Sequence, residues 1–324
     1  MSKVLVIEEF GGPEVLQWQD VEVGSPGEGE ALIRHTAVGL NFIDTYQRTG
    51  LYPLELPTGL GLEAAGEVIS VGAGVDYVQP GDRVAYTSMP AGAYAEQRIY
   101  PADKLVKLPA GIDNQTAAAA MLKGLTAWYL LHRSYAVKLG DSVLLYAAAG
   151  GVGLIAAQWA KHLGVNVIGV VSTPEKAALA KQHGCAGIVM GDATDFVAQV
   201  RAATDGKGVA AVYDSVGKDT FEQSLDCLRP HGTMVSFGNA SGPVAPVPLT
   251  ELSRRGSLFL TRPAVFDFIS TPEDLRAAAA KLFTVLESGA VKIEIGQTWP
   301  LVEVADAHRA LESRQTTGST VLLP

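Results

Sequence analysis

The stretch from Asp141 to Thr173 constrains the fold of this chain more than any other. It holds a short apolar run at 142–146, a small-residue turn ending in Gly150-Gly151-Val152-Gly153, apolar residues at helical spacing, and a second apolar run at 165–171. Short apolar runs of this kind are typical of buried parallel strands. The whole stretch therefore predicts a βαβ unit, whose glycine turn offers the free N–H groups of a helix N-terminus to a pyrophosphate.

The glycine turn departs from the usual G-x-G-x-x-G pattern at one point, because Ala148 occupies its first position. Binders of the unphosphorylated dinucleotide usually place an acid about 20 residues beyond the glycines, on the ribose. Here the second apolar run ends in Ser172 and Thr173, and Thr173 is expected to cap a helix that starts at Pro174. Glu175 is expected to be a first-turn acid facing the helix dipole, which leaves Ser172 and Lys176 at the ribose end. An ordinary solvated helix lysine is the alternative for Lys176. Because a hydroxyl and a cation suit a 2′-phosphate, NADPH is predicted rather than NADH.

Length and charge narrow the class of protein. A chain of 324 residues predicts about two domains. A net charge of −9 disfavours nucleic acid and anionic membrane surfaces as partners. No apolar run reaches membrane-spanning length, and no signal-peptide pattern precedes the first strand. The two cysteines lie far apart in sequence and fit a reducing compartment, so a cytoplasmic location is expected.

The predicted elements divide the chain into three parts. Residues 1–123 read as short strands separated by Gly and Pro, with a short helix from Asn41, and predict a small β-barrel. Two helices, joined at Lys123-Gly124, are expected next. Residues 124–264 alternate strands and helices, which predicts a doubly wound parallel sheet. The tail, 265–324, has too few elements for a core of its own and is expected to pack on the first domain.

Within that tail the patterns predict a long amphipathic helix that starts near Thr271, then a strand at Val291–Ile295, a helix at Val302–Ser313 and a final strand at Ser319–Leu323.

Short motifs spread over nearly the whole chain carry a family resemblance. The motifs are Gly39–Tyr46, Gly50–Pro53, Gly59–Gly66, Pro80–Val84, Lys123–Thr126, Ala147–Gly153, Tyr213–Gly217, Ser236–Asn239, Thr261–Pro263 and Glu312–Arg314. In them the chain resembles the zinc-free members of the medium-chain dehydrogenase/reductase superfamily, most specifically the bacterial NADPH:quinone oxidoreductases related to zeta-crystallin. The resemblance implies an α/β protein with a GroES-like β-barrel catalytic domain (1–123 and 265–324), a Rossmann domain (124–264) and the cofactor in the cleft between them.

No metal site is expected. Zinc-dependent relatives have a ligand cysteine at the position of Asn41 and a His-Glu pair at the position of Leu62-Glu63, and neither Asn41 nor Leu62 serves as such a ligand. Two cysteines do not make a four-thiolate site, and the six histidines lack ligand spacing, so each is interpreted as a surface or satisfied core residue. Without a Lewis acid, alcohol oxidation is disfavoured.

Quinone reduction asks less of the protein, because its product is a stabilised anion that needs only a nearby hydrogen-bond donor. Asn41 and Tyr46 are the residues expected to contact quinone or nicotinamide, and Tyr52 to gate the site. Helix capping is the alternative role for Asn41, and aromatic packing for the two tyrosines.

The resemblance also assigns the cofactor contacts. They are Asn41, Thr126, Gly150, Gly151, Val152, Gly153, Ser172, Lys176, Val216, Phe237, Gly238, Asn239, Arg262 and Arg314. Relatives often carry a tyrosine near the 2′-phosphate where this chain has Gly191, so the preference for NADPH rests on Ser172, Lys176 and the missing acid.

A homodimer is implied as well. The apolar stretch Ser257–Thr261 is expected to form a late edge strand of the Rossmann sheet, and pairing with its copy in a second chain protects such an edge.

Two other functions stay open. One is NADPH-dependent reduction of the C=C bond of α,β-unsaturated carbonyls, which also needs a proton for the α-carbon. The other is a non-enzymatic, crystallin-like role in binding NADPH or RNA, against which the acidic charge argues. The physiological quinone, and whether electrons leave singly or as a hydride, are not encoded in these patterns.

Overall fold

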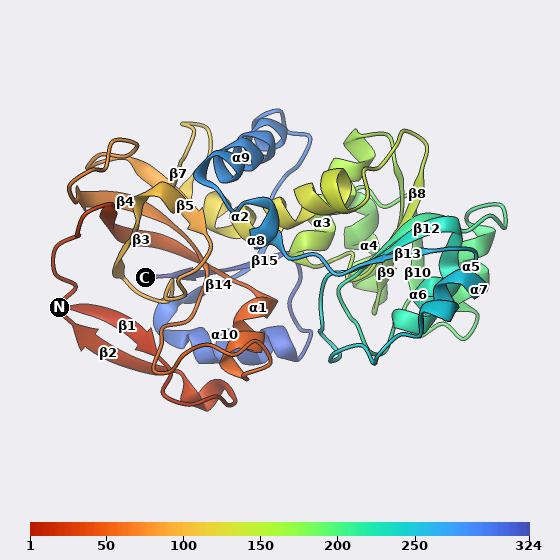
Figure 1. The fold of residues 1–324 in the computed structure, drawn as a ribbon, viewed down its shortest axis with the longest axis horizontal. Helices are drawn as coiled ribbons and strands as arrows, with labels where there is room; N and C mark the ends of the chain where they lie inside the picture. Colours follow the sequence, from red (N-terminus) through yellow and green to blue (C-terminus); the bar gives the residue numbers. More distant parts are fainter. The chain divides into compact units, whose positions relative to one another are not determined.

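The computed structural model describes residues 1–324 and divides into two compact units, which are described separately (Figure 1). The first unit comprises Met1–Lys123, Ile269–Glu287 and Ile293–Pro324, and the second comprises Gly124–Phe268 and Ser288–Lys292. None of the helices combines the length and the apolar character that a membrane span requires.

The first unit is built on a seven-stranded sheet and a two-stranded one. In the larger sheet the strand order is β14-β15-β3-β4-β5-β7, with β6 also paired to β3, and β1 pairs with β2 in the smaller. The strands are β1 (Ser2–Val6), β2 (Gln17–Val21), β3 (Glu30–Leu40), β4 (Glu63–Val71), β5 (Arg83–Thr87), β6 (Gln97–Pro101), β7 (Val106–Lys107), β14 (Ile295–Pro300) and β15 (Ser319–Leu323). The helical segments are η1 (Pro13–Val15), α1 (Phe42–Arg48), η2 (Ala102–Lys104), α9 (Pro272–Glu287), η4 (Leu301–Glu303) and α10 (Val304–Glu312).

Strand β3 is central to this sheet because it pairs antiparallel with β4, β6 and β15. Its side chains alternate between buried and exposed over its first half and are buried throughout its last four residues. That change carries the strand from the barrel surface into the core, and the chain then turns directly into α1. The end of β3 therefore positions Asn41 and the short helix that follows.

The second unit is a parallel six-stranded sheet with helices between its strands. Its order, β10-β9-β8-β11-β12-β13, is that of a complete doubly wound dinucleotide-binding sheet. The strands are β8 (Ser142–Leu145), β9 (Asn166–Val171), β10 (Gly187–Met190), β11 (Val209–Asp214), β12 (Leu228–Ser236) and β13 (Phe259–Thr261). The helical segments are η3 (Leu130–Ser134), α3 (Gly151–His162), α4 (Pro174–Gln182), α5 (Phe196–Ala202), α6 (Phe221–Cys227), α7 (Leu249–Arg254) and α8 (Val265–Phe268).

The prediction of two helices joined at Lys123-Gly124 was wrong. A single helix, α2 (Asn114–Tyr129), runs through Gly124 and is continued by the π-helical segment η3. Glycine inside a helix costs only about 1 kcal/mol. Residues 117–131 are all buried, and this burial outweighs that local cost.

The tail also differs from its prediction in one strand. Val291–Ile295 was expected to be a strand, but the strand β14 begins only at Ile295 and extends to Pro300. Its partner is β15, with which it pairs in parallel, and that pairing rather than local apolar character fixes its limits. The final strand, Ser319–Leu323, lies where it was predicted.

Candidate functional site

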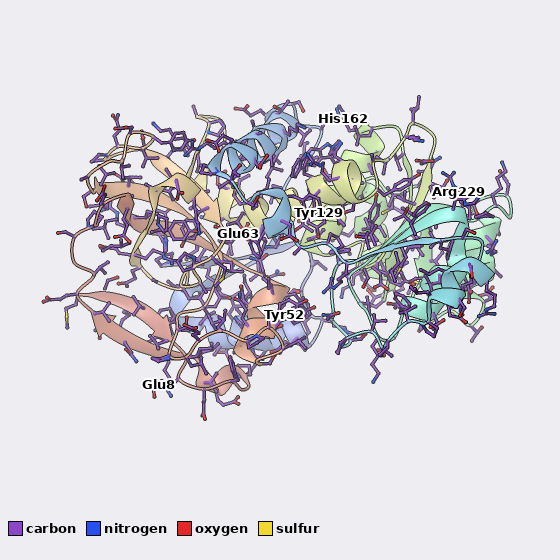
Figure 2. All side chains as sticks on the ribbon, in the orientation of Figure 1. Glu8, Tyr52, Glu63, Tyr129, His162 and Arg229 are labelled. Atoms are coloured by element: carbon purple, nitrogen blue, oxygen red, sulfur yellow. The ribbon has the colours of Figure 1, made fainter.

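In the first unit, Asn41 stands at the start of α1 and faces the carboxylate of Glu63 on β4 (Figure 2 labels Glu63). The Asn41 Nδ2 atom donates to Glu63 Oε2 at 2.8 Å. A carboxylate only accepts hydrogen bonds here, which fixes the amide with its nitrogen towards Glu63. Asn41 is therefore held by more than helix capping, and its side chain is buried.

The Glu63 carboxylate has no exposed surface and collects three donors. Its Oε1 accepts the backbone N–H of Leu122 at 2.6 Å, and its Oε2 accepts Lys123 Nζ at 3.3 Å in addition to Asn41. Gly39 makes this possible, because a Cβ at Gly39 would lie 2.2 Å from Glu63 Oε2 and 2.3 Å from a backbone oxygen of α2. The result is a buried ion pair between Lys123 and Glu63, beside Asn41.

Asp44 sits one turn into α1, fully buried, and its Oδ2 accepts the Asn41 backbone N–H at 2.9 Å and the Tyr94 hydroxyl at 2.7 Å. Its Oδ1 has no hydrogen-bond partner. Burial raises the pKa of Asp44 to about 7, although the donors Tyr94 and Asn41 and the charge of Lys123 act against that rise. The neighbouring Glu63 carboxylate adds to it.

Behind Asp44 a chain of hydrogen bonds leads to Arg48 and Glu312. Arg48 Nη1 contacts His308 Nδ1 at 2.9 Å, and His308 Nε2 contacts the Tyr94 hydroxyl at 3.0 Å. Arginine only donates, so Nδ1 must accept and the proton must lie on Nε2. Every proton in the chain is therefore oriented from Arg48 towards Asp44. Burial, followed by the charge of Arg48, lowers the pKa of His308 to about 3.

The far end of this chain is anchored by an ion pair. Arg48 donates to Glu312 of α10 in a bidentate pair, at 3.0 and 2.7 Å. Bidentate arginine–carboxylate pairs combine charge with fixed geometry. This pair fastens the C-terminal helix α10 to α1.

The two candidate tyrosines pack against each other. The rings of Tyr46 and Tyr52 meet edge to face with centroids 5.2 Å apart, and the Tyr52 backbone N–H donates to the Tyr46 carbonyl at 3.0 Å. Tyr46 is largely buried, and Tyr52 (labelled in Figure 2) is partly exposed. The structure thus brings Asn41, Tyr46 and Tyr52 together around α1.

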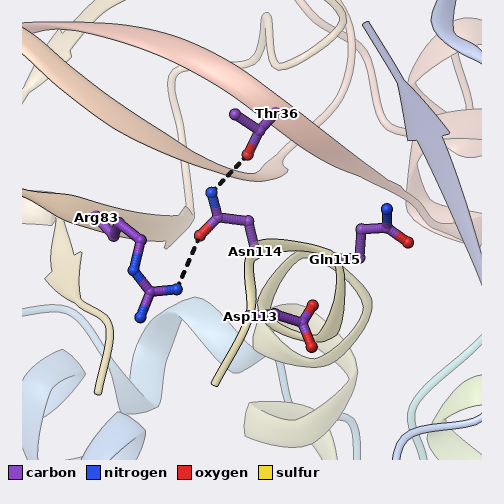
Figure 3. A pocket seen from close by; sticks show the side chains of 5 residues that line it. All are labelled: Thr36, Arg83, Asp113, Asn114 and Gln115. Atoms are coloured by element: carbon purple, nitrogen blue, oxygen red, sulfur yellow. Dashed lines mark hydrogen bonds between the residues drawn. The ribbon is translucent and has the colours of Figure 1, made fainter. Parts of the chain in front are cut away.

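A hollow of about 570 Å³ on the first unit involves none of the predicted site residues. It is lined by Thr36, Arg83, Asp113, Asn114 and Gln115 (Figure 3). Three of its polar side chains are already engaged: Asn114 donates to Thr36 at 2.7 Å and accepts from Arg83 at 3.3 Å, and Arg83 also donates to two backbone carbonyls. These bonds join α2 to β3 and β5. They give the polar residues a structural role that requires no ligand.

In the second unit, the glycine turn joins β8 to α3 as predicted. Gly150 is the N-cap of α3 and no side chain caps the helix, so its first N–H groups remain available to an anion. A Cβ at Gly153 would lie 2.3 Å from the Ala147 carbonyl oxygen, so only glycine lets the helix approach the turn this closely. Ala147 itself adopts a φ of 49°, an unfavourable conformation for alanine of the kind that gathers at functional sites.

The structure also explains the alanine in the glycine pattern. A Cβ at Gly169 of β9 would lie 2.8 Å from the Ala148 Cβ. Gly169 therefore leaves the space that the Ala148 methyl group fills.

The predicted cofactor residues of this unit follow the carboxyl ends of neighbouring parallel strands, which meet at one edge of the sheet. The glycine turn follows β8, Ser172 and Lys176 follow β9, Val216 follows β11, Phe237–Asn239 follows β12 and Arg262 follows β13.

Two bonds order this edge further. Thr173 caps α4 by accepting the Lys176 N–H at 3.3 Å, as predicted. Arg262 donates to the Ser236 carbonyl at 2.8 Å.

Asp214, at the end of β11, orders the loops of this edge and was not singled out from the sequence. Its Oδ1 accepts the N–H groups of Val216 and Gly217 at 2.7 and 3.1 Å, and its carbonyl accepts that of Phe237 at 2.8 Å. Burial raises its pKa, and the hydrogen bonds from Thr220 and the backbone oppose that rise. An acid directly after an apolar strand was the available signal for it.

The other predicted cofactor residues lie elsewhere. Thr126 is in α2 and nearly buried. Arg314 belongs to the first unit, follows α10 and has a φ of 60°. The sequence reasoning also missed Asp44, Tyr94 and His308 as a connected group, because their contacts join segments up to 214 residues apart.

No group of three or more His, Cys, Asp or Glu side chains is arranged to hold a metal ion. At the position of Leu62 the structure places a fully buried aliphatic side chain, and His35 and His308 are buried and hydrogen-bonded.

Fold and site together define a two-unit protein of the dehydrogenase type, with a barrel unit and a dinucleotide-binding unit. The protein-family model of the alcohol dehydrogenase GroES-like domain matches residues 27–110, and the protein-family model of the zinc-binding dehydrogenases matches residues 151–283. The chain is 54% identical to a quinone oxidoreductase of Pseudomonas aeruginosa, over 100% of both chains. The chain belongs to the quinone oxidoreductase family of the medium-chain dehydrogenases/reductases.

Two further comparisons bear on its chemistry. The solved structure of Escherichia coli quinone oxidoreductase complexed with NADPH superposes with a TM-score of 0.97, at 47% identity, and the match covers 99% of this chain and 100% of the other. A 2-haloacrylate reductase of a Burkholderia species is also 47% identical, over 100% of this chain and 99% of its own.

Proposed function

We propose that this protein is an NADPH-dependent quinone reductase that works without zinc. The observation that carries the proposal is the uncapped glycine turn at the carboxyl edge of a complete doubly wound sheet, in a chain of this family. In this proposal residues 1–123 and 265–324 form the catalytic domain, and residues 124–264 form the NADPH-binding domain.

The residues fit NADPH. The N–H groups at the start of α3 suit its pyrophosphate, and the close packing at Gly153 leaves the turn open to it. β9 ends at Val171 without an acid, and Ser172 and Lys176, which follow it, suit the 2′-phosphate. The acid nearby, Glu175, belongs to the first turn of α4. When bound, NADPH supplies the hydride.

The chain's own groups prepare the acceptor site. Asn41 donates one amide hydrogen to Glu63, and its side chain also takes part in the capping box with Asp44, so its second amide hydrogen is left to orient quinone or nicotinamide. Tyr46 and Tyr52 offer an aromatic edge to a flat substrate, and the partly exposed Tyr52 gates it. Zinc independence rests on donor chemistry: an amide and a buried leucine replace a thiolate and an imidazole.

The test is NADPH oxidation with 1,4-benzoquinone or 9,10-phenanthrenequinone, run beside NADH and with a zinc chelator. Turnover with NADPH that the chelator does not change is expected. Turnover that stops with chelator and returns with added zinc would refute zinc independence, and absence of any quinone turnover would refute the function.

A second candidate is reduction of the C=C bond of α,β-unsaturated carbonyls. The similarity to a 2-haloacrylate reductase at 47% identity favours it. Both reactions place negative charge on a substrate oxygen after hydride addition, so one site suits both. Rates with methyl vinyl ketone or 2-chloroacrylate, compared with those for quinones, decide which substrate class is preferred.

A homodimer through β13 is part of the proposal. This strand is the last in the sheet, and Phe259 and Leu260 expose 61% and 37% of their surface. An exposed apolar edge strand invites pairing with its copy in a second chain. Light scattering at micromolar concentration should give twice the mass of 34.0 kDa, and a monomer there would remove the idea.

A further inference from the structure

The Lys123 ammonium is buried yet poorly matched by acceptors. Its side chain is 8% exposed, and its one hydrogen bond is to Glu63 Oε2 at 3.3 Å. An ammonium carries three donors. Glu63 is served by shorter bonds, from the Leu122 N–H at 2.6 Å and Asn41 Nδ2 at 2.8 Å. The carboxylate is therefore well satisfied, whereas two N–H groups of the cation have no acceptor in the protein.

A buried ammonium without enough acceptors lowers the stability of the folded protein, which suggests that it serves another purpose. Buried ion pairs often contribute little to stability, and charged donors without acceptors are destabilising. The same burial makes the charge effective towards an anion, because little water screens it.

Its position fits such a use. Lys123 Nζ and Asn41 Nδ2 donate to the same oxygen, so the ammonium is a direct neighbour of the residue proposed to orient the substrate.

We propose that Lys123 is a further catalytic residue, whose free N–H groups bind the substrate oxygen that becomes negative during reduction. The inference rests on the proposed function and applies to quinones and to α,β-unsaturated carbonyls alike. A hydride, which is a proton with two electrons, is transferred from NADPH to the substrate and leaves NADP⁺ behind. The negative charge that it brings is carried by the carbonyl oxygen of the substrate. Lys123 keeps its protons, and a proton from water later neutralises the product. The cation takes the electrostatic part that zinc plays in the metal-dependent relatives.

The variants must separate catalysis from structure, because removing Lys123 alone leaves Glu63 as an unpaired buried charge. The informative variant is the double substitution Lys123→Met with Glu63→Gln, and its matched control is Glu63→Gln alone. If Lys123 acts on the substrate, the double variant should have a kcat roughly 100-fold or more below that of the control. Its NADPH dissociation constant should stay close to that of the control, and its melting temperature should not be lower, because the control keeps an unpaired buried ammonium that the double variant lacks. Equal kcat values in the two variants would overturn the proposal.

A second measurement needs no turnover. 4-Nitrophenol absorbs differently as phenol and phenolate, and its phenolate resembles the proposed anion. Bound to the NADP⁺-loaded wild-type protein, it should ionise about one pH unit lower than in water, because an adjacent cation favours the anion. The double variant should lose this shift. The same ionisation in wild type and double variant would overturn the role of Lys123.

The two proposals fail differently. A wild-type protein that binds NADPH and reduces neither quinone nor enone refutes the proposed function, whatever the phenol shows. Brisk quinone turnover without a phenolate shift, and with equal kcat values in the two variants, refutes Lys123 alone.

Discussion

Asp44→Asn should stabilise this protein at alkaline pH, although it alters a buried hydrogen-bonded residue. The pKa of Asp44 rises from its ordinary 3.8 to about 7 in the folded protein, with burial as the main cause. Between these values the folded state binds a proton that the unfolded state has released, so the free energy of unfolding falls as pH rises. The full difference corresponds to roughly 4 kcal/mol, of which about 3 kcal/mol falls between pH 5 and pH 8.

Asparagine stays neutral throughout this range. Its carbonyl oxygen can accept the Asn41 N–H and the Tyr94 hydroxyl as Oδ2 of Asp44 does. When the pH is raised from 5 to 8, the free energy of unfolding of the variant should therefore increase by roughly 3 kcal/mol relative to that of wild type.

The assay is urea unfolding of both proteins at pH 5 and pH 8, followed by circular dichroism, with the midpoint and slope compared. In the unfolded state His35 and His308 titrate within the same range, but both residues occur in both proteins, so their effects cancel in the difference. If the free energy of unfolding changes by the same amount in wild type and variant between pH 5 and pH 8, the pKa of Asp44 is not raised. That result would also refute the orientation of the donors around Asp44.

Three further outcomes are expected. Burial lowers the pKa of His35 to about 4. The contribution of neutral His35 to the free energy of unfolding is therefore complete above pH 6.5 and is lost as the pH falls to 4. The melting temperature of His35→Gln should fall less on acidification than that of wild type. Gly153→Ala should weaken NADPH binding at least tenfold and lower stability by about 1–3 kcal/mol, because its Cβ meets backbone at 2.3 Å. In Gly150→Ala the nearest atom is 3.2 Å away, so fluorescence titration should show a smaller loss. Lys176→Ala should raise the NADPH Michaelis constant about tenfold and leave that of NADH nearly unchanged, and equal losses with both cofactors would contradict its role at the 2′-phosphate.

The dinucleotide-binding sheet was predictable because its determinants are local. The glycine turn, the helix after it and the cap at Thr173 are written within a few residues of one another, and the structure has them where the pattern placed them. The break at Gly124 was mispredicted for the same reason: local helix preference disfavours glycine, whereas the burial that sustains α2 comes from distant segments.

The polar interior of the barrel unit was beyond such reasoning. Glu63 and Lys123 are single charges within apolar runs, which is a signal of buried pairing, but nothing in either run names the partner. Tyr94 and His308 look like ordinary core residues in sequence, and only the antiparallel sheet and α10 bring them to Asp44.

The ordered donors from Arg48 to Asp44 also have a consequence for proton traffic. A hydrogen-bonded file conducts protons only if each member can both take one up and pass one on, and arginine does not give up its proton in proteins. The hydrogen bonds through His308 and Tyr94 thus do not conduct protons between the partly exposed Glu312 and the buried Asp44. A proton therefore does not reach Asp44 from Glu312 along these hydrogen bonds.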